Sequence, residues 1–188
     1  MNMATEEDII GKILRDLRVE LSEEWDRNFE RKAFFSRPWK PRVCEGRGSL
    51  MMQTGRLRRS LKVKVTGNAV IWSSTEPYAA IHNDGGTITV TAKMKRYFWA
   101  KYYTLTGKIH HRKDGSTAKR SMRVSREAEY YRNLALMKAG SRITIPKRQF
   151  IGDAPEVKTC VERVCGNRMK DVETMLLSAL KNGTINKS

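Results

Sequence analysis

Apolar residues in the first thirty positions recur at steps of three and four. The series is Ile10, Ile13, Leu14, Leu17 and Leu21, extended by Trp25 and Phe29. This spacing places the side chains on one face of a helix. Thr5 can cap that helix, and three acidic residues follow it in the first turn, where negative charge is favourable. The pattern predicts a long amphipathic helix over residues 6 to about 32.

A different pattern follows, in which helix-breaking residues give way to alternation. Residues 34–49 contain two prolines and two glycines around Trp39, which favours an irregular loop. Apolar and polar residues then alternate from Leu61, Gly67-Asn68 gives a turn signal, and apolar residues return over 69–72. These features predict a β-hairpin. Residues 87–91 are rich in β-branched side chains and are predicted to add a third strand to its sheet.

The stretch 92–142 mixes aromatic and basic residues. Its aromatic residues include Tyr97, Phe98, Trp99, Tyr102 and Tyr103. Residues 107–125 carry few apolar side chains, which predicts a flexible loop that trypsin cleaves first. A short helix is predicted over 126–138, ending before Gly140, and a short strand over 143–145.

A second long amphipathic pattern begins after residue 152. Asp153 can cap the helix, and Pro155 is tolerated in its first turn. One side of the helix is apolar, with Val157, Val161, Val164, Val172, Met175, Leu176 and Ala179. Gly183 suits its end. The chain is thus predicted to be α+β, with long N-terminal and C-terminal helices packed on a small, mainly antiparallel sheet and with a basic insertion over 92–142.

The length of 188 residues fits a single domain spanning 1–188. No apolar run is long enough to cross a membrane, and the acidic N-terminus does not fit a secretory signal. We therefore expect a soluble protein that is neither exported nor membrane-bound. The odd number of cysteines favours reduced thiols, and their spacing gives little support to a zinc site.

Positive charge is concentrated in the middle of the chain. The net charge is +17, yet residues 1–30 carry four basic and nine acidic side chains. Residues 92–148 carry sixteen basic and three acidic ones. Such a segment can meet a polyanion, either nucleic acid or the acidic face of a neighbouring subunit. A solvated basic loop with no partner is an equally good interpretation.

The chain offers little for catalysis. His110 and His111 have only Asp114 nearby as a carboxylate, and His82 lies beside Asn83 and Asp84. A nuclease needs several metal ligands or a base paired with a metal, and no such spacing occurs. Nucleotide-binding and hydrolase signatures are also missing from the sequence. We expect no enzyme activity, no cofactor, no metal site and no small-molecule substrate.

Three blocks of sequence resemble the phage virion morphogenesis, or tail completion, family of Mu-like and P2-like phages. The first block matches T-G-x-L-x-x-S at Thr54, Gly55, Leu57 and Ser60. The second resembles Y-A-x-I-H-x-x-G at Tyr78, Ala79, Ile81, His82, Gly85 and Gly86. The third resembles I-P-x-R-x-F-x-G at Pro146, Arg148, Phe150 and Gly152. Their order between two long helices makes the resemblance specific, and 92–142 is its poorest part.

The resemblance implies a non-enzymatic component of the head-tail junction. It implies a structural protein that completes the tail of a tailed bacteriophage or prophage and enables head-tail joining, with other tail and connector proteins as partners. Closed symmetry would allow a ring of identical subunits in the virion neck, and a stable monomer before assembly fits the sequence equally well. Synthesis is expected in the cytoplasm of the bacterial host. A DNA-binding protein that uses the basic segment 92–148 is the alternative, with Tyr97, Trp99 and Tyr103 as stacking groups.

The same blocks have a physical interpretation. Gly55 can take the positive φ that a turn requires, and Phe150 and Gly152 suit a core position and a turn before the last helix. Tyr78 and Ile81 are expected in the core, and His82 is expected to be a hydrogen-bonded polar group. Leu57 and Leu61 are expected to point inward while the neighbouring arginines either bind a partner or are merely solvated.

Candidates for an assembly interface are the basic residues Arg56, Arg58, Arg59, Arg112, Lys113, Lys119 and Arg120. Reversing the charge of the first three is expected to leave folding intact and to block head-tail joining, because surface substitutions usually change stability by less than about 0.5 kcal/mol.

Overall fold

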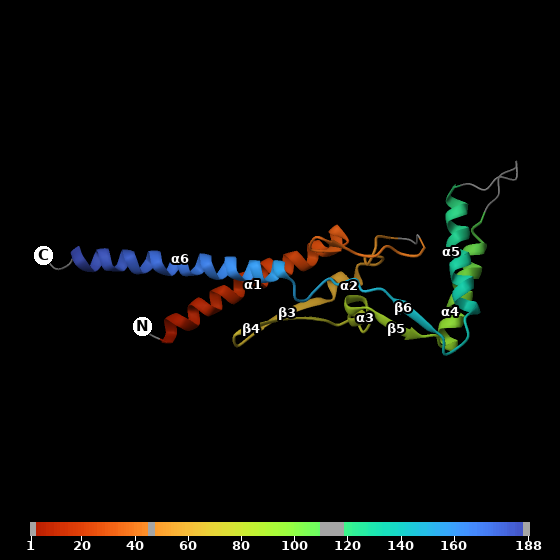
Figure 1. The fold of residues 1–188 in the computed structure, drawn as a ribbon, viewed down its shortest axis with the longest axis horizontal. Coiled ribbons are helices and arrows are strands. Elements are labelled where there is room, and N and C mark those ends of the chain that lie inside the picture. The colour runs from red at the N-terminus through yellow and green to blue at the C-terminus, as the bar shows by residue number, and fades with distance from the viewer. Residues whose placement is uncertain (1–2, 45–47, 110–118, 186–188) are drawn as a thin grey trace. The chain divides into compact units, whose positions relative to one another are not determined.

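The computed structural model describes residues 3–44, 48–109 and 119–185. The chain divides into two compact units (Figure 1). Unit 1 comprises 1–38, 56–77 and 150–188, and unit 2 comprises 39–55 and 78–149. Both units draw on segments that are far apart in the sequence. The expectation of a single domain over 1–188 stays a prediction.

Two long helices form the body of unit 1. Helix α1 spans Met3–Arg31 and helix α6 spans Pro155–Ile185, and they pack against each other. Arg168 pairs with Asp16 and Arg163 with Glu20, so the two helices run in opposite directions. Both long helices predicted from the apolar stripes are confirmed.

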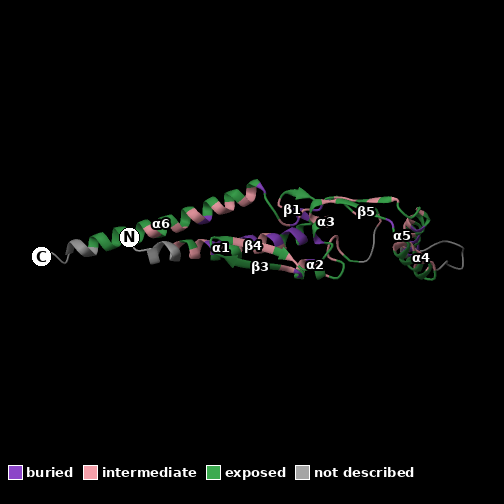
Figure 2. Ribbon diagram, turned by 90° about the horizontal axis from the view of Figure 1, so that it is seen from below, coloured by how far each residue is buried: buried purple, intermediate pink, exposed green. Residues whose placement is uncertain are grey.

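The core of unit 1 lies along α1. The predicted stripe is buried at Leu14, Leu17, Leu21, Trp25 and Phe29 (Figure 2). Trp25 stacks on Phe34 and meets Trp72 edge-on, with ring centroids 5.9 and 6.2 Å apart. Aromatic contacts of this kind add to the free energy gained from burial alone. The apolar face of the helix therefore organises the rest of the unit.

Short elements complete unit 1. The predicted hairpin is confirmed as β3 (Leu61–Thr66) and β4 (Ala69–Ser74), joined through Gly67 at φ +54°. The Trp72 indole donates to the Ser22 hydroxyl of α1 at 3.0 Å. Strands β1 (Ala33–Phe34) and β2 (Arg37–Pro38) form a two-residue ladder, and α2 (Arg56–Arg59) precedes β3.

Unit 2 contains its own two-stranded ladder. Helix α3 spans Ala79–Asp84, and β5 (Gly86–Thr89) pairs antiparallel with β6 (Arg142–Ile145). The strand near Thr87 was predicted to join the hairpin sheet, and that prediction is wrong. Its partner is β6, and the Val90 amide extends the pairing by donating to the Ser141 carbonyl at 2.8 Å.

Two helices fill most of the predicted basic insertion. Helix α4 spans Ala92–Thr106 and helix α5 spans Lys119–Leu136. The Thr91 hydroxyl caps α4 by accepting from the Met94 amide at 3.2 Å. Phe98 of α4 and Ala128 and Ala135 of α5 are buried, and the Phe98 ring lies near Tyr131 of α5, with centroids 6.3 Å apart. The expected loop is thus wrong over 119–125, while residues 110–118 lie outside the described part of the chain.

The ends of α6 also differ from the sequence prediction. The helix begins at Pro155, so Ala154 precedes it and accepts hydrogen bonds from the amides of its first turn, while Asp153 lies one position further out. It continues through Gly183 to Ile185. A single glycine weakens a helix without ending it. Among the described residues no helix is long and apolar enough to span a bilayer. The α+β class is confirmed, with three separate two-stranded ladders in place of one sheet.

Candidate assembly interface

The T-G-x-L-x-x-S block crosses from unit 2, which contains Thr54 and Gly55, into unit 1, where Leu57 and Ser60 lie just before the hairpin. Gly55 has φ +70°, as expected for its turn, and Leu57 is buried. The Ser60 hydroxyl lies 2.7 Å from the Leu57 carbonyl and 2.6 Å from the Ser74 hydroxyl of β4. Thr54 is exposed. Most of the block therefore serves the fold.

The three arginines of this block have different surroundings. Arg58 binds the carboxylates of Asp26 and Glu30 on α1, and these hydrogen bonds raise the pKa of its guanidinium. Arg56 lies 3.1 Å from Glu76. Arg59 is exposed. Because Arg58 joins α2 to α1, its charge reversal would strain the fold as well as any interface, so the triple reversal cannot separate the two roles.

The other interface candidates are at the start of α5 or before it. Lys119 and Arg120 are the first residues of α5, where only the backbone is described. Arg112 and Lys113 lie outside the described residues. An interface role for any of these seven basic residues stays a prediction.

The second and third blocks meet in unit 2. The Arg148 amide donates to the His82 carbonyl at 2.8 Å, and Gly86 pairs with Ile145 across the ladder. Gly85 has φ +76°, and a Cβ there would lie 2.9 Å from the Lys147 amide nitrogen. Only glycine fits this approach without displacing the backbone.

Arg148 fixes the loop that follows β2. Its side chain is only 9% exposed and donates from Nε to the Lys40 carbonyl and from Nη2 to the Pro41 carbonyl, at 2.9 and 3.2 Å. Trp39 donates to the Gln149 carbonyl at 2.6 Å in the same region. Burial, and then Arg42, lower the pKa of Arg148. The sequence did not indicate that this arginine would bind backbone carbonyls.

The Y-A-x-I-H stretch forms α3 and its entry. Ala79 is buried, and Ile81, which was expected in the core, is partly buried. Tyr78 was expected in the core but is 37% exposed. Its ring contacts the His82 ring edge-on. His82 Nδ1 is buried and has no hydrogen-bond partner among the described residues, so the expected pairing is wrong. Burial, and then Arg148, lower its pKa.

The end of the third block enters the core of unit 1. Phe150 is buried against Phe29, with ring centroids 5.2 Å apart, and Gly152 turns the chain at φ +130°. Both expectations are confirmed. Asn28, also buried, donates to the Phe150 carbonyl at 3.2 Å and accepts from the Phe35 amide at 2.9 Å. Its place on the apolar face of α1 was the signal that sequence reasoning missed.

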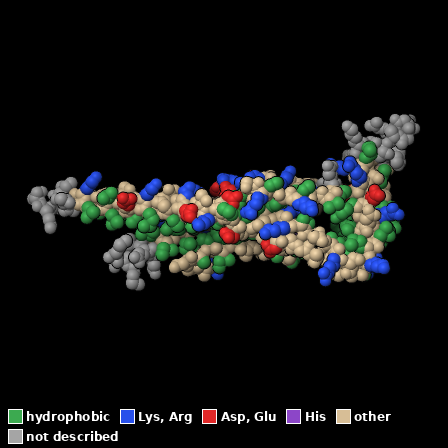
Figure 3. All heavy atoms as spheres, in the orientation of Figure 1, with side chains coloured by type: hydrophobic (Ala, Val, Ile, Leu, Met, Phe, Trp, Pro, Cys, Tyr) green, Lys and Arg blue, Asp and Glu red, His purple; other side chains and the backbone are tan. Residues whose placement is uncertain are grey.

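Large apolar side chains are exposed on the C-terminal half of α6. Val164 in the first half is buried, as the stripe predicts, whereas the later members are not. The exposed large residues of this α6 apolar surface are Met169, Met175, Leu176, Leu177 and Leu180. Leu180 keeps 68% of its area exposed. Figure 3 shows green side chains along this part of the helix. Contiguous apolar patches on a soluble protein mark interaction sites.

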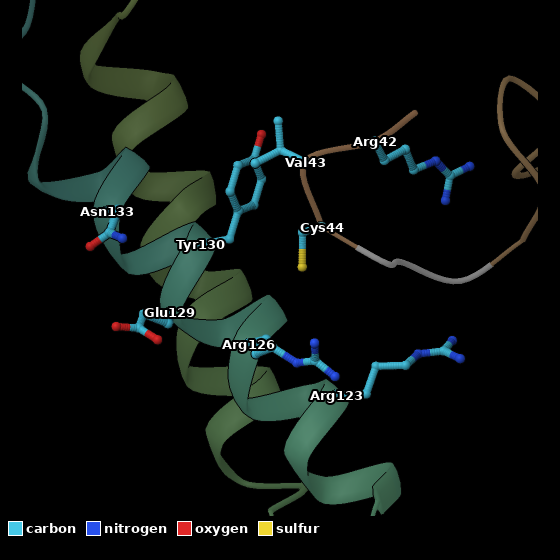
Figure 4. A pocket seen from close by; sticks show the side chains of 8 residues that line it. All are labelled: Arg42, Val43, Cys44, Arg123, Arg126, Glu129, Tyr130 and Asn133. Atoms are coloured by element: carbon cyan, nitrogen blue, oxygen red, sulfur yellow. The ribbon is translucent and has the colours of Figure 1, made fainter. Parts of the chain in front are cut away.

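A basic pocket lies between α5 and the loop at 42–44 in unit 2. Its lining residues are Arg42, Val43, Cys44, Arg123, Arg126, Glu129, Tyr130 and Asn133 (Figure 4). Arg123 and Arg126 extend from α5 toward the loop, whereas Glu129 extends from the opposite side of the helix. The pocket is open, and three guanidinium groups dominate its polar lining. It can receive an anionic group.

Groups suited to catalysis are sparse in the described part of the chain. It holds no cluster of three histidine, cysteine or carboxylate side chains that could bind a metal ion. No disulfide links Cys44, Cys160 or Cys165 within the described residues. Burial and the hydrogen bond to Glu20 raise the pKa of Cys160, which disfavours the reactive thiolate. His110 and His111 lie outside the described residues.

The sequence profile of the phage virion morphogenesis family matches residues 3–170. No curated protein and no solved structure gives a significant match.

Proposed function

Because the chain belongs to the phage virion morphogenesis family, and so acts in virion assembly, we propose that it completes the tail of a bacteriophage or prophage and enables head-tail joining. Subunits add to the end of a finished tail and create the surface that the head recognises. The partners are tail and head-tail connector proteins, and the place of action is the virion neck.

The α6 apolar surface is the observation that supports this proposal most directly. Four of its five exposed side chains, all except Met169, lie between Thr174 and Leu180, a stretch with no charged residue. Exposing these apolar side chains to water does not stabilise an isolated subunit. We propose that α6 of one copy packs here against the next copy, so that subunits close into a ring.

A joining assay tests the proposal. Heads and tails from a phage that lacks this chain are mixed with the purified full-length protein, and plaque-forming particles are counted. We expect the wild-type protein to restore joining. The L176Q/L180Q variant should lower the number of joined particles at least tenfold, and its copies on the tails should stay monomeric. Glutamine keeps the helix propensity of leucine but removes the apolar surface.

The matched control is V65T/I71T, which removes apolar surface from exposed positions of the hairpin. This control should join heads to tails as the wild type does. Joining that needs no added protein, or that L176Q/L180Q supports fully, would contradict the proposal.

We propose further that the protein is structural and has no catalytic activity. His82 is half-buried beside Tyr78, and its neutral form is favoured, which suits a packing role. Plasmid DNA incubated with the protein and magnesium, manganese or zinc should stay intact. Cleavage would overturn this statement and leave the assembly proposal to its own test.

A further inference from the structure

Helix α4 carries positive charge that its own chain does not neutralise. Between Ala92 and Thr106 the sequence has four basic residues and no acidic one. Lys93, Arg96 and Lys101 are exposed, and at about 100° per residue they spread over about 140° of the helix circumference. None of them forms an ion pair with another residue in the described part of the chain. Such a face attracts a polyanion.

Aromatic rings lie among these cations. Tyr97 and Tyr103 expose more than half of their area, at 53% and 64%. The Lys101 ammonium lies 5.6 Å from the Tyr97 ring centroid. Trp99 and Tyr103 stack with centroids 5.8 Å apart and an interplanar angle of 23°. Exposed rings beside cations are the combination that binds bases and phosphates together.

Helix α5 adds guanidinium groups to the same hairpin of helices. Arg123 and Arg126 border the open pocket of Figure 4, while Glu129 extends away from them. Arginine binds phosphate oxygens in a bidentate manner that lysine cannot match. Arg42, across the pocket, donates to the Gly48 carbonyl at 3.3 Å, so its position is held by the loop.

We propose that the α4–α5 hairpin binds the phosphate backbone of nucleic acid, with Tyr97 and Tyr103 stacking on unpaired bases. An acidic protein surface could also pair with the cations. Nucleic acid is favoured because its phosphates can meet the cations while its bases stack on the exposed rings. This binding is independent of the role in joining, since it uses a different unit from the α6 apolar surface.

Fluorescence anisotropy with labelled DNA tests the proposal on the full-length protein. Single-stranded and duplex oligonucleotides of mixed sequence are titrated at several salt concentrations. We expect affinity to fall at least a hundredfold between about 50 and 200 mM salt, as phosphate contacts release counterions. K93E/R96E/K101E should weaken binding at least tenfold and reduce the slope of log K against log salt by about three.

The control variant is K62E/K64E/K170E, which removes the same net charge from exposed positions of unit 1. It should leave the slope unchanged, because non-local charge contributes little at these salt concentrations. Y97A/Y103A should weaken single-stranded binding at least fivefold and duplex binding much less. If a charge-reversed variant fails to fold by circular dichroism, K93Q/R96Q/K101Q replaces it, with the same sign of effect expected.

Two results would overturn the proposal. In one, the hairpin and control variants weaken binding equally, which would reduce it to a net-charge effect. In the other, the wild type does not bind DNA at about 50 mM salt. Loss of head-tail joining by K93E/R96E/K101E together with that second result would assign the surface to an acidic protein partner.

Discussion

Units 1 and 2 use charge in opposite ways. Unit 1 has 18 basic and 15 acidic residues, for a net charge of +3, whereas unit 2 has 19 and 5, for a net charge of +14. Ion pairs in unit 1 join α6 to α1 and α2 to α1. On α4, the exposed lysines have no described carboxylate partner. Charge thus supports the fold in unit 1 through ion pairs, whereas the basic residues of α4 in unit 2 form no described ion pair.

Large side chains make up more of the buried core in unit 1 than in unit 2. Unit 1 buries large aromatic side chains, including Trp25, Phe29 and Phe150. Unit 2 buries Trp39 and Phe98, while the buried positions of α5 carry small side chains, at Ser121, Ala128 and Ala135. Since apolar stabilisation grows with the area buried, large truncations should cost most in unit 1.

The largest effect should come from W25A. Removing a buried tryptophan typically costs about 3–5 kcal/mol, and Trp25 contacts Phe34, Phe35 and Trp72. Urea denaturation should show this loss in W25A and a loss below about 0.5 kcal/mol in Y103A, an exposed ring of unit 2. Equal losses in both variants would remove the contrast between the cores.

R148M tests the buried guanidinium that binds the carbonyls of the loop after β2 in unit 2. Without the guanidinium, the Lys40 and Pro41 carbonyls lose their donors, which should cost about 1–3 kcal/mol in urea denaturation. The exposed neighbour gives the control K147M, with an expected change below about 0.5 kcal/mol. If R148M unfolds at the same urea concentration as wild type, water replaces the guanidinium and the loop does not depend on it.

R58Q tests whether charge supports the fold in unit 1. It removes the ion pairs with Asp26 and Glu30 and should cost about 1 kcal/mol, an effect that salt reduces. The exposed Lys62 provides the control K62Q, for which no measurable change is expected. If joining by R58Q falls only as far as its stability falls, Arg58 acts through the fold. If joining is lost while the protein stays stable, Arg58 belongs to the interface.

Mild acid should destabilise unit 2 through His82. Its folded pKa lies below the ordinary 6.5 because burial disfavours the imidazolium, so the unfolded chain binds the proton first. The stability is therefore fully present above pH 6.5 and is lost as pH falls toward the folded pKa. Urea midpoints of wild type and H82Q should diverge over this window. Parallel pH profiles would show that His82 does not contribute.

The smallest effect is expected from K93E/R96E/K101E on stability. Because these cations form no described ion pair, their reversal should change the melting temperature little, or raise it slightly by relieving repulsion. Thermal denaturation checks this. A marked fall in melting temperature would mean that the basic face of α4 supports the fold.

Periodicity in the sequence predicted the parts of the fold that repeat locally. The stripes from Ile10 to Phe29 and from Val157 to Val164, and the alternation around Gly67, each specify an element within one short window. Helix α4 was missed because lysines interrupt its aromatic residues and one buried residue, Phe98, carries much of its packing. The regular apolar pattern of α6 also did not indicate that the side chains beyond Met169 are exposed, because a sequence pattern does not show what packs against a helix.

Contacts between distant segments could not be predicted in this way. The ladder of Gly86 with Ile145 and the approach of Arg148 to His82 join residues about sixty positions apart. The motif blocks marked these residues without indicating what they contact. Arg58 shows the limit most clearly, because its sequence context fits a solvated arginine, and only the fold brings Asp26 and Glu30 to it.

Electron microscopy of particles made without this chain tests the central claim most directly. A phage carrying a stop codon early in the gene is grown with and without the wild-type protein supplied in trans, and the particles are negatively stained. We predict that filled heads and full-length tails accumulate separately without the protein, and that its supply yields joined virions. Joined, infectious virions in its absence would contradict the account.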